Sequence, residues 1–253
     1  MIFDITNKKK ALKTLADYLH LEESWIEKYV DDHQLDYDAV HFLKEANIDS
    51  NTLSLDHLQL IGMHLTSNDD ECLSIKKDGL QDLFHVLSKN LGLASFLKEL
   101  GMSFDLDNQT FHYQDQVISL LESSWEEIKN KIYDQSVVHA FLRVGDFGYF
   151  SAKLQIRPEI ITMLSQKFVD SNMDSFWDLN HDTYLIKFVE DIEHFDYSSL
   201  AEHGLEKDVA LQLIYFALDV IALNEHCEIS CHLKKGHCIL PEKIIDIHRF
   251  YNN

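Results

Sequence analysis

The scarcity of turn-forming residues constrains the fold more than any other feature of this sequence. The chain of 253 residues contains only 8 glycines and 2 prolines. An all-β sandwich or barrel needs many tight turns, and those turns depend largely on these two residues. The sequence therefore predicts a helix-rich protein, and a hydrophobic content of 45% supplies a sizeable core.

The charge balance limits the partners of the chain. Lys and Arg number 22 against 43 Asp and Glu, which gives a net charge of −21. Binding to nucleic acid depends on clustered Lys and Arg that contact phosphates, so this charge argues against a nucleic-acid-binding protein. Solubility explains the acidic excess. A second explanation is an acidic face that meets a basic partner surface.

We expect a cytoplasmic protein without a membrane partner. The N-terminal stretch "MIFDITNKKKALKTL" lacks the apolar core of a signal peptide. The longest apolar run, residues 209–223, is too short to cross a bilayer and is interrupted by Gln212 and Asp219. Four cysteines in a chain of this length, without an export signal, indicate a reducing compartment.

Hydrophobic periodicity predicts an α+β protein with an N-terminal helical appendage over residues 1–52. The remainder, residues 53–253, is expected to hold a small central sheet, antiparallel or mixed. The expected elements are strands near residues 58–66, 149–154, 184–189 and 227–240, a hairpin at 103–113, and helices at 118–133, 205–223 and 241–250.

Residues 64–80, "HLTSNDDECLSIKKDGL", combine a strand end with a short helix. His64 and Thr66 are two residues apart on the expected strand, so their side chains share one face. An imidazole and a hydroxyl in this arrangement can hydrogen-bond a ribose, although an ordinary strand end has the same spacing. The helix is expected to begin with a cap from Ser67 or Asn68 and to end at Gly79.

Three pieces of the sequence form a pattern when they are taken in chain order: "HLTS" with "IKKDGL", then "FGYFSAK", then "CEISCHLKKGHCILPEKI". They resemble the His-x-Thr strand, the tyrosine strand and the late glutamate of ADP-ribosyltransferases, of the diphtheria-toxin and poly(ADP-ribose) polymerase kind. The spacing between the first two pieces would require an insertion at about residues 81–140. The resemblance implies an ADP-ribosyltransferase-like domain over residues 53–253.

The resemblance also implies an activity, which is NAD-dependent ADP-ribosyl transfer to a macromolecular acceptor, in the manner of toxin, defence or counter-defence effectors. Cleavage of the nicotinamide–ribose bond develops an oxocarbenium-like sugar, which a carboxylate stabilises. The roles that it implies are Glu228 and Tyr149 as catalytic residues, and His64, Thr66 and Ser151 as residues that bind NAD. Arg143, Lys153 and Arg157 lie near Tyr149 in the sequence and could contact the pyrophosphate of NAD, although surface charge explains each of them singly.

Several alternatives stay open within this interpretation. Tyr113 or Tyr133 could take the place of Tyr149, and Glu225 could take the place of Glu228. A degenerate member would keep the fold without the activity. A rival from a different class is a non-enzymatic, acidic interaction or inhibitor protein that occupies a basic partner surface. An enzyme should bring His64, a tyrosine and a late glutamate together, whereas a binding protein should show a broad acidic face.

No metal site is expected in this sequence. The segment "EHCEISCHLKKGHC" contains ligand types that suit zinc, but its Cys-x3-Cys-x6-Cys spacing is not that of a zinc finger. On a hairpin, Cys227 and Cys231 would share one packed face as buried thiols. Walker, Gly-x-Gly-x-x-Gly and His-Glu-x-x-His motifs are also absent from the sequence.

Overall fold

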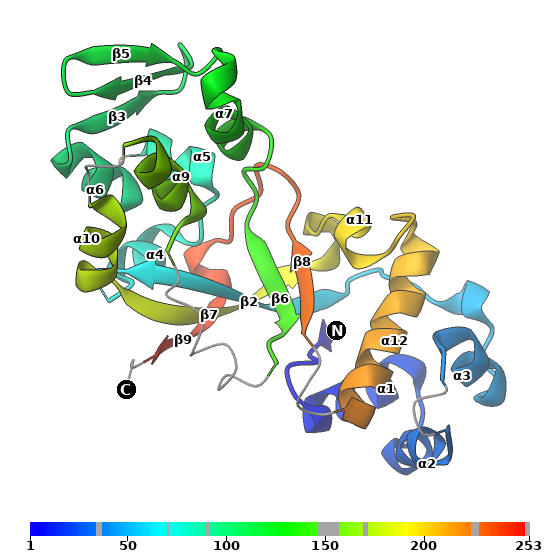
Figure 1. The fold of residues 1–253 in the computed structure, drawn as a ribbon. Helices are drawn as coiled ribbons and strands as arrows, with labels where there is room; N and C mark the ends of the chain where they lie inside the picture. The colour runs from blue at the N-terminus through cyan, green and yellow to red at the C-terminus, as the bar shows by residue number, and fades with distance from the viewer. Residues whose placement is uncertain are drawn as a thin grey trace. The chain divides into compact units, whose positions relative to one another are not determined.

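The computed structural model describes residues 1–33, 37–69, 71–89, 92–145, 157–168, 172–223 and 228–250. It confirms the predicted α+β class, with one six-stranded and one three-stranded sheet among these residues (Figure 1). Contacts divide the chain into two compact units. Unit 1 comprises Met1–His64, His139–Lys153 and Lys187–Lys234, and unit 2 comprises Leu65–Val138, Leu154–Ile186 and Lys235–Asn253.

The larger sheet has the strand order β8-β6-β2-β7-β9, and β1 also pairs with β2. The pairing of β1 with β2 is parallel, whereas β2 with β6 and β6 with β8 are antiparallel, so the sheet is mixed. The strands are β1 (Ile2–Phe3), β2 (Gln59–Asn68), β6 (His139–Arg143), β7 (Asp182–Asp191), β8 (Ile229–His232) and β9 (Ile244–Phe250).

In unit 1, helix α1 (Lys8–Leu19) packs against the long helix α12 (Glu206–Leu223), as Figure 1 shows. Helix α1 begins after Asn7, whose side chain accepts a hydrogen bond from the backbone N–H of Lys10 at 3.0 Å. This bond satisfies one of the free amides at the helix start. The predicted helices in this region and at 205–223 are therefore confirmed.

The first fifty residues make many of their contacts with α12. Helices α2 (Glu23–His33) and α3 (Ala39–Glu45) both contact α12, and the hydroxyl of Tyr37 donates to Asp219 Oδ1 at 2.8 Å. The contacts therefore divide the chain differently from the boundary predicted at residue 52. The physical reason is that the short helices bury their apolar faces against α12, which comes much later in the sequence.

Unit 2 has its own core between a three-stranded sheet and several helices. Phe104 of β3 pairs with Phe111 of β4, as the pattern "SFDLDNQTFHY" predicts, and Phe111 is fully buried. The elements of this unit are β3 (Met102–Asp105), β4 (Thr110–Tyr113), β5 (Gln116–Ser119), α4 (Leu73–Asp78), α5 (Leu83–Ser88), α6 (Leu93–Glu99), α7 (Glu126–Tyr133), α9 (Glu159–Lys167) and α10 (Met173–Asn180).

The predicted helix over residues 118–133 is wrong in its first half. Strand β5 occupies its beginning and pairs with β4, so that Phe111 lies opposite Ile118. Helix α7 begins only at Glu126. Residues 117–121 contain an apolar run that suits either structure, and pairing with the neighbouring strand decides in favour of the strand.

The predicted hairpin over residues 227–240 is also wrong. Ser230 and Cys231 of β8 pair with β6, whereas Ile239 forms an isolated bridge with Leu80. The turn at "KKG" exists, with Gly236 at φ +80°. The segments before and after this turn pair with partners that are distant in the sequence, which a local pattern cannot reveal.

The segment "PEKIIDIHRF" was expected as a closing helix, and this expectation is wrong. Only Pro241–Lys243 forms a helical turn, and the rest is strand β9, which neighbours β7. Three isoleucines in this segment favour a strand because their branched side chains fit a pleated surface. The expected strand at 149–154 lies outside the described residues. No helix among the described residues is both long and apolar enough to cross a bilayer.

Gly62 on β2 allows close packing in unit 1. A Cβ atom at this position would lie 2.3 Å from Cζ of Phe188 on β7, and the Phe188 ring is fully buried. Glycine is therefore needed here for the space that its missing side chain leaves, because the ring of Phe188 fills that space.

We predict that Gly62→Ala destabilises the protein by about 1–3 kcal/mol, because the added methyl group forces the Phe188 ring out of its packed position. The measurement is urea unfolding of wild type, Gly62→Ala, Phe188→Leu and the double variant. The leucine side chain vacates part of the space, so Gly62→Ala should cost less in the Phe188→Leu background. Equal costs in the two backgrounds would contradict this explanation.

Candidate functional site

His64 lies on the central strand β2 and has a fixed hydrogen-bonding polarity. Its Nδ1 lies 2.7 Å from the backbone oxygen of His139 on the neighbouring strand β6. A carbonyl oxygen only accepts hydrogen bonds, so Nδ1 carries the proton and donates it. Burial lowers the pKa of the His64 imidazole below its usual value, although the bond to His139 opposes this effect. The ring is therefore neutral at pH 7, and its Nε2 is an acceptor.

Thr66 follows His64 on the same strand β2, two residues later, and is half-buried. Side chains at this spacing on a strand share a face. The prediction that the two residues lie on one extended strand is confirmed. Their predicted contact with a ribose stays a prediction.

Glu228 is exposed and directly precedes strand β8. Ser230 of β8 lies opposite Phe141 of β6, and Phe141 lies opposite Met63 of β2. Residues that are directly opposite in antiparallel strands share a face, and adjacent residues along a strand point to opposite faces. The register between β6 and β8 shifts between Phe141 and Arg143, so this alternation does not extend to Glu228, which lies outside β8. The register therefore gives no support for a pocket shared by His64 and Glu228.

Arg143 has a structural contact in unit 1. Its side chain is buried, and its Nη1 donates to the backbone oxygen of Thr6 at 2.6 Å. This bond satisfies part of the guanidinium inside the protein, where an unpaired charge is costly. The predicted contact between Arg143 and a pyrophosphate stays a prediction.

The aromatic residue of the predicted site is not described. Tyr149 and Ser151 lie outside the described residues, as does Glu225. The two alternative tyrosines take part in the packing of unit 2. Tyr133 donates its hydroxyl to the backbone oxygen of Leu106 at 2.8 Å, and the ring of Tyr113 lies 4.2 Å from that of Phe168, measured between centroids.

Leu80, at the end of the first piece, meets Ile239 of the third piece in unit 2. Leu80 and Ile239 form an antiparallel bridge in which each backbone N–H donates to the other residue's oxygen, at 3.0 and 2.9 Å. Gly79 has φ +79°, and a Cβ atom there would lie 1.9 Å from the backbone oxygen of Ile239. The bridge therefore requires glycine at this position, both for its backbone conformation and for its lack of a side chain.

The prediction for the start of helix α4 is wrong. Strand β2 continues through Asn68, and the helix begins only after Cys72, without a cap from a side chain. Ser67 instead accepts a hydrogen bond from the indole N–H of Trp177 at 2.9 Å, and Asn68 Oδ1 accepts one from the backbone N–H of Cys72 at 2.9 Å. Asn68 therefore stabilises the turn that leads into the helix, whereas Ser67 binds a residue distant in the sequence.

Cys231 is buried on β8, and burial raises the pKa of its thiol to about 12. The thiolate is the form that binds metal or acts as a nucleophile, and burial disfavours it. Cys227 lies outside the described residues. The expectation that this segment binds no zinc stays a prediction.

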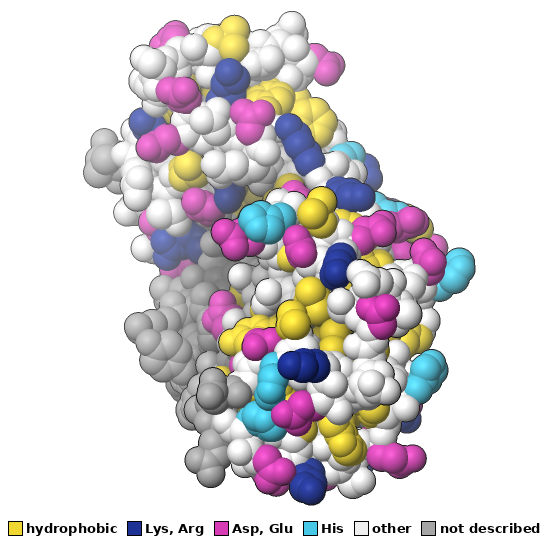
Figure 2. All heavy atoms as spheres, turned by 90° about the vertical axis from the view of Figure 1, so that its right-hand side faces the viewer, with side chains coloured by type: hydrophobic (Ala, Val, Ile, Leu, Met, Phe, Trp, Pro, Cys, Tyr) yellow, Lys and Arg dark blue, Asp and Glu magenta, His cyan; other side chains and the backbone are white. Residues whose placement is uncertain are grey.

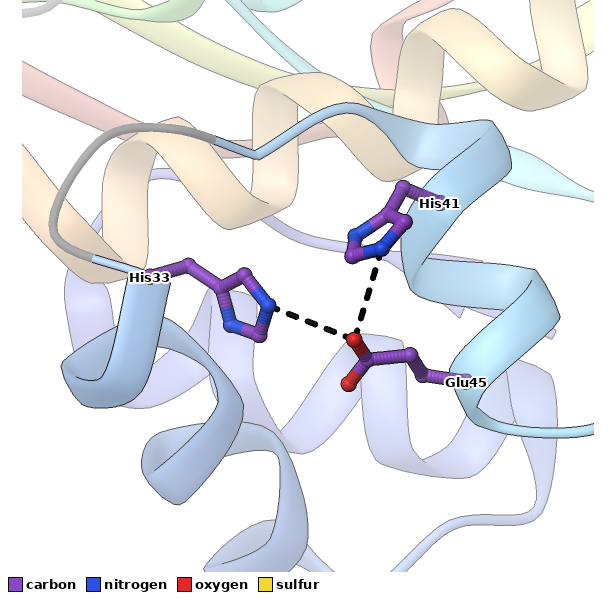
Figure 3. Close-up of side chains that lie close together, drawn as sticks. All are labelled: His33, His41 and Glu45. Carbon is purple, nitrogen blue, oxygen red and sulfur yellow. Dashed lines mark ion pairs between the residues drawn. The ribbon is translucent and has the colours of Figure 1, made fainter.

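Among the clusters of described residues that could hold a metal ion, and that the sequence analysis missed, is the one formed by His33, His41 and Glu45 (Figure 3). The spacing of His41 and Glu45, four residues apart on a helix, places both on one face and was a usable signal. The position of His33 beside them depends on how α2 and α3 pack together. Periodicity alone does not specify that packing.

Comparisons with protein-family models, with curated proteins and with solved structures find no match for this chain.

We predict that Gly79→Ala lowers the free energy of unfolding by roughly 3 kcal/mol or more. The substitution combines a strained backbone conformation with a clash against a backbone oxygen that cannot move aside. Gly101→Ala is the matched control, because Gly101 has φ +75° but no atom within 4 Å of the added Cβ. Chemical unfolding of both variants measures the difference, and equal losses would contradict the steric part of this explanation.

We also predict that wild type loses stability below about pH 6.5 more steeply than His64→Asn. The pKa of His64 is lower in the folded than in the unfolded protein, so the unfolded chain binds the proton first as the pH falls. The stability that His64 contributes is thus complete above the pKa of His64 in the unfolded chain, and it is lost as the pH falls below that value. Asparagine keeps a donor for the His139 oxygen without titrating. Urea unfolding between about pH 7.5 and pH 5 measures both profiles, and parallel profiles would contradict the prediction.

Proposed function

We propose that this chain is an ADP-ribosyltransferase-like protein that binds NAD and transfers its ADP-ribose to a macromolecular acceptor, most simply a protein. The observation that carries the proposal is the bridge between Leu80 and Ile239. These residues end the first and belong to the third of the pieces that resemble the family, and they are far apart in the sequence. Because the two pieces pair with each other, their resemblance to the family is better explained by descent from it than by a chance similarity of short motifs.

The polarity of His64 also supports the proposal. A neutral imidazole whose Nδ1 is committed to the His139 oxygen presents Nε2 as an acceptor. A ribose hydroxyl is a suitable donor for it. His64 would then make the same contact to the sugar before and during the reaction, so its main contribution would be to NAD affinity.

The proposed reaction breaks the bond between nicotinamide and the ribose. The electron pair of this bond leaves with the nicotinamide, and the sugar carbon becomes positively charged until the acceptor's nucleophile bonds to it. A carboxylate beside the ribose stabilises that charge. Glu228 and Glu225 are the candidates, and the register of β8 with β6 does not extend to Glu228. The choice between them is therefore left to the variants below.

The composition of the chain indicates the compartment in which the proposed protein would act. A chain with four cysteines and a net charge of −21 suits the cytoplasm, and an effector of the toxin, defence or counter-defence kind would meet its acceptor there. The rival proposal, an acidic interaction protein, would be favoured by a continuous acidic face. On the face seen in Figure 2, acidic side chains are interspersed with basic side chains (Lys or Arg), His and uncharged side chains. This face does not favour the rival.

The test is incubation of the protein with labelled NAD, alone and with cell lysate, followed by measurement of NAD binding, nicotinamide release and labelled acceptors. We expect His64→Ala to weaken NAD binding. Either Glu228→Gln or Glu225→Gln should lower turnover about a hundredfold while binding is retained, because the amide keeps the size but loses the charge.

His203→Ala and Glu202→Gln are matched controls, because these substitutions repeat the same chemical changes at exposed residues of unit 1 that are not part of β2. They should bind and turn over NAD as wild type does. Wild-type protein that neither binds nor cleaves NAD would refute the enzyme, and the acidic interaction protein would take its place. Wild type that binds NAD without cleaving it would identify a degenerate member of the fold.

A further inference from the structure

We infer that His33, His41 and Glu45 form a binding site for Zn²⁺ or a similar late transition-metal ion, which fastens helix α2 to helix α3. His33 is the last residue of α2, and His41 and Glu45 lie one turn apart on α3. Figure 3 shows the three side chains pointing toward one another. The site lies within unit 1 and does not depend on the proposed activity.

The separations between the ligand atoms suit a tetrahedral ion. Nε2 of His33 lies 3.3 Å from Glu45 Oε1, and Nε2 of His41 lies 3.4 Å from the same oxygen. The three ligand atoms all lie within 4.8 Å of one another. Zinc binds nitrogen and oxygen at about 2.0–2.2 Å, so two ligands at a tetrahedral angle lie roughly 3.3–3.5 Å apart. Two of the three separations therefore match those of a tetrahedral ion.

The position of the proton on the His33 ring favours a cation between His33 and Glu45. Its Nδ1 lies 2.7 Å from the backbone oxygen of Tyr29, so Nδ1 carries the proton of the neutral ring. Its Nε2 then has a lone pair, and that lone pair faces an oxygen of the Glu45 carboxylate. Two acceptors that face each other repel, and either a proton or a metal ion between them removes the conflict.

Tyr29 holds both histidines in this orientation. Its ring stacks on that of His33 at 4.0 Å between centroids, and its hydroxyl lies 3.1 Å from Nδ1 of His41. The Tyr29 side chain is itself buried, so it is a rigid support. A hydrogen bond to the second nitrogen of a ligating histidine is the usual way in which proteins orient such ligands. Both histidines have that partner here.

The donor set selects the class of metal. Two imidazole nitrogens and one carboxylate oxygen suit zinc and its neighbours, whereas Mg²⁺ and Ca²⁺ prefer oxygen ligands alone. Three protein ligands leave a fourth position for water. His41 and Glu45 are partly exposed, so an ion can reach the cluster from solvent.

A second cluster, Asp82, His85 and Cys238 in unit 2, shows what distinguishes the first. There Nδ1 of His85 lies 2.8 Å from Asp82 Oδ1, and burial raises the pKa of the Cys238 thiol. A proton on Nδ1 joins His85 to Asp82 in an ordinary hydrogen bond, so no cation is required. This cluster therefore serves as a control for the first.

The test is equilibrium dialysis of chelator-treated protein against ZnCl₂, with bound zinc measured by elemental analysis. We expect wild type to bind one more equivalent of zinc than Glu45→Gln at zinc concentrations that saturate the site. Titration with Co²⁺ should give the visible absorption of a tetrahedral site in wild type and not in Glu45→Gln. Tyr29→Phe should weaken zinc binding about tenfold or more, because His41 loses the partner of its second nitrogen.

Glu27→Gln is the matched control, because it removes one exposed carboxylate of α2 that is not part of the cluster. Glu27→Gln and His85→Gln should both bind zinc as wild type does at this site. Circular dichroism of each variant checks that the fold is retained. Equal zinc binding by wild type and Glu45→Gln would overturn the inference and would leave a proton as the cation between His33 and Glu45.

Discussion

Strand β2 is the constraint on which the larger sheet depends. It pairs with β1, β6 and β7, so the chain contributes partners to it from its first residues and from two later regions. A Cβ atom at position 62 would lie 2.3 Å from Cζ of Phe188 on β7, so the glycine leaves the space that this ring fills. His64 on this strand is held by the neighbouring β6 through the oxygen of His139. The same strand therefore organises the sheet and fixes the tautomer of the residue with the most specific chemistry in the proposed NAD site.

Backbone oxygens determine the chemistry of the two most informative histidines. Nδ1 of His64 faces the oxygen of His139, and Nδ1 of His33 faces the oxygen of Tyr29. In both cases the proton of the neutral ring must lie on Nδ1, and Nε2 is left as a base. The two residues differ in the group that faces Nε2. Glu45 faces that of His33, which calls for a cation, whereas we propose that a ribose hydroxyl meets that of His64.

The sequence predicted the helices and strands with strong, long periodicity. The α+β class, helix α1, helix α12 and the strand that carries His64 were all specified by local patterns. It did not predict the pairing of Ile239 with Leu80, nor the strand β9 at the end of the chain. Short apolar segments suit a helix or a strand equally, and partners that are distant in the sequence decide which one forms.

The site shows the same division between local and distant information. The sequence by itself determined which chemical groups exist: a histidine and a hydroxyl on one strand, a glycine after a short helix, and a histidine one helical turn from a glutamate. The tertiary structure alone decided which of them meet. The packing of α2 on α3 brought His33 to Glu45, and the pairing of distant segments brought Leu80 to Ile239. A local pattern sets the direction of a side chain relative to its own element, whereas the residue that it meets depends on how separate elements bury their apolar faces together.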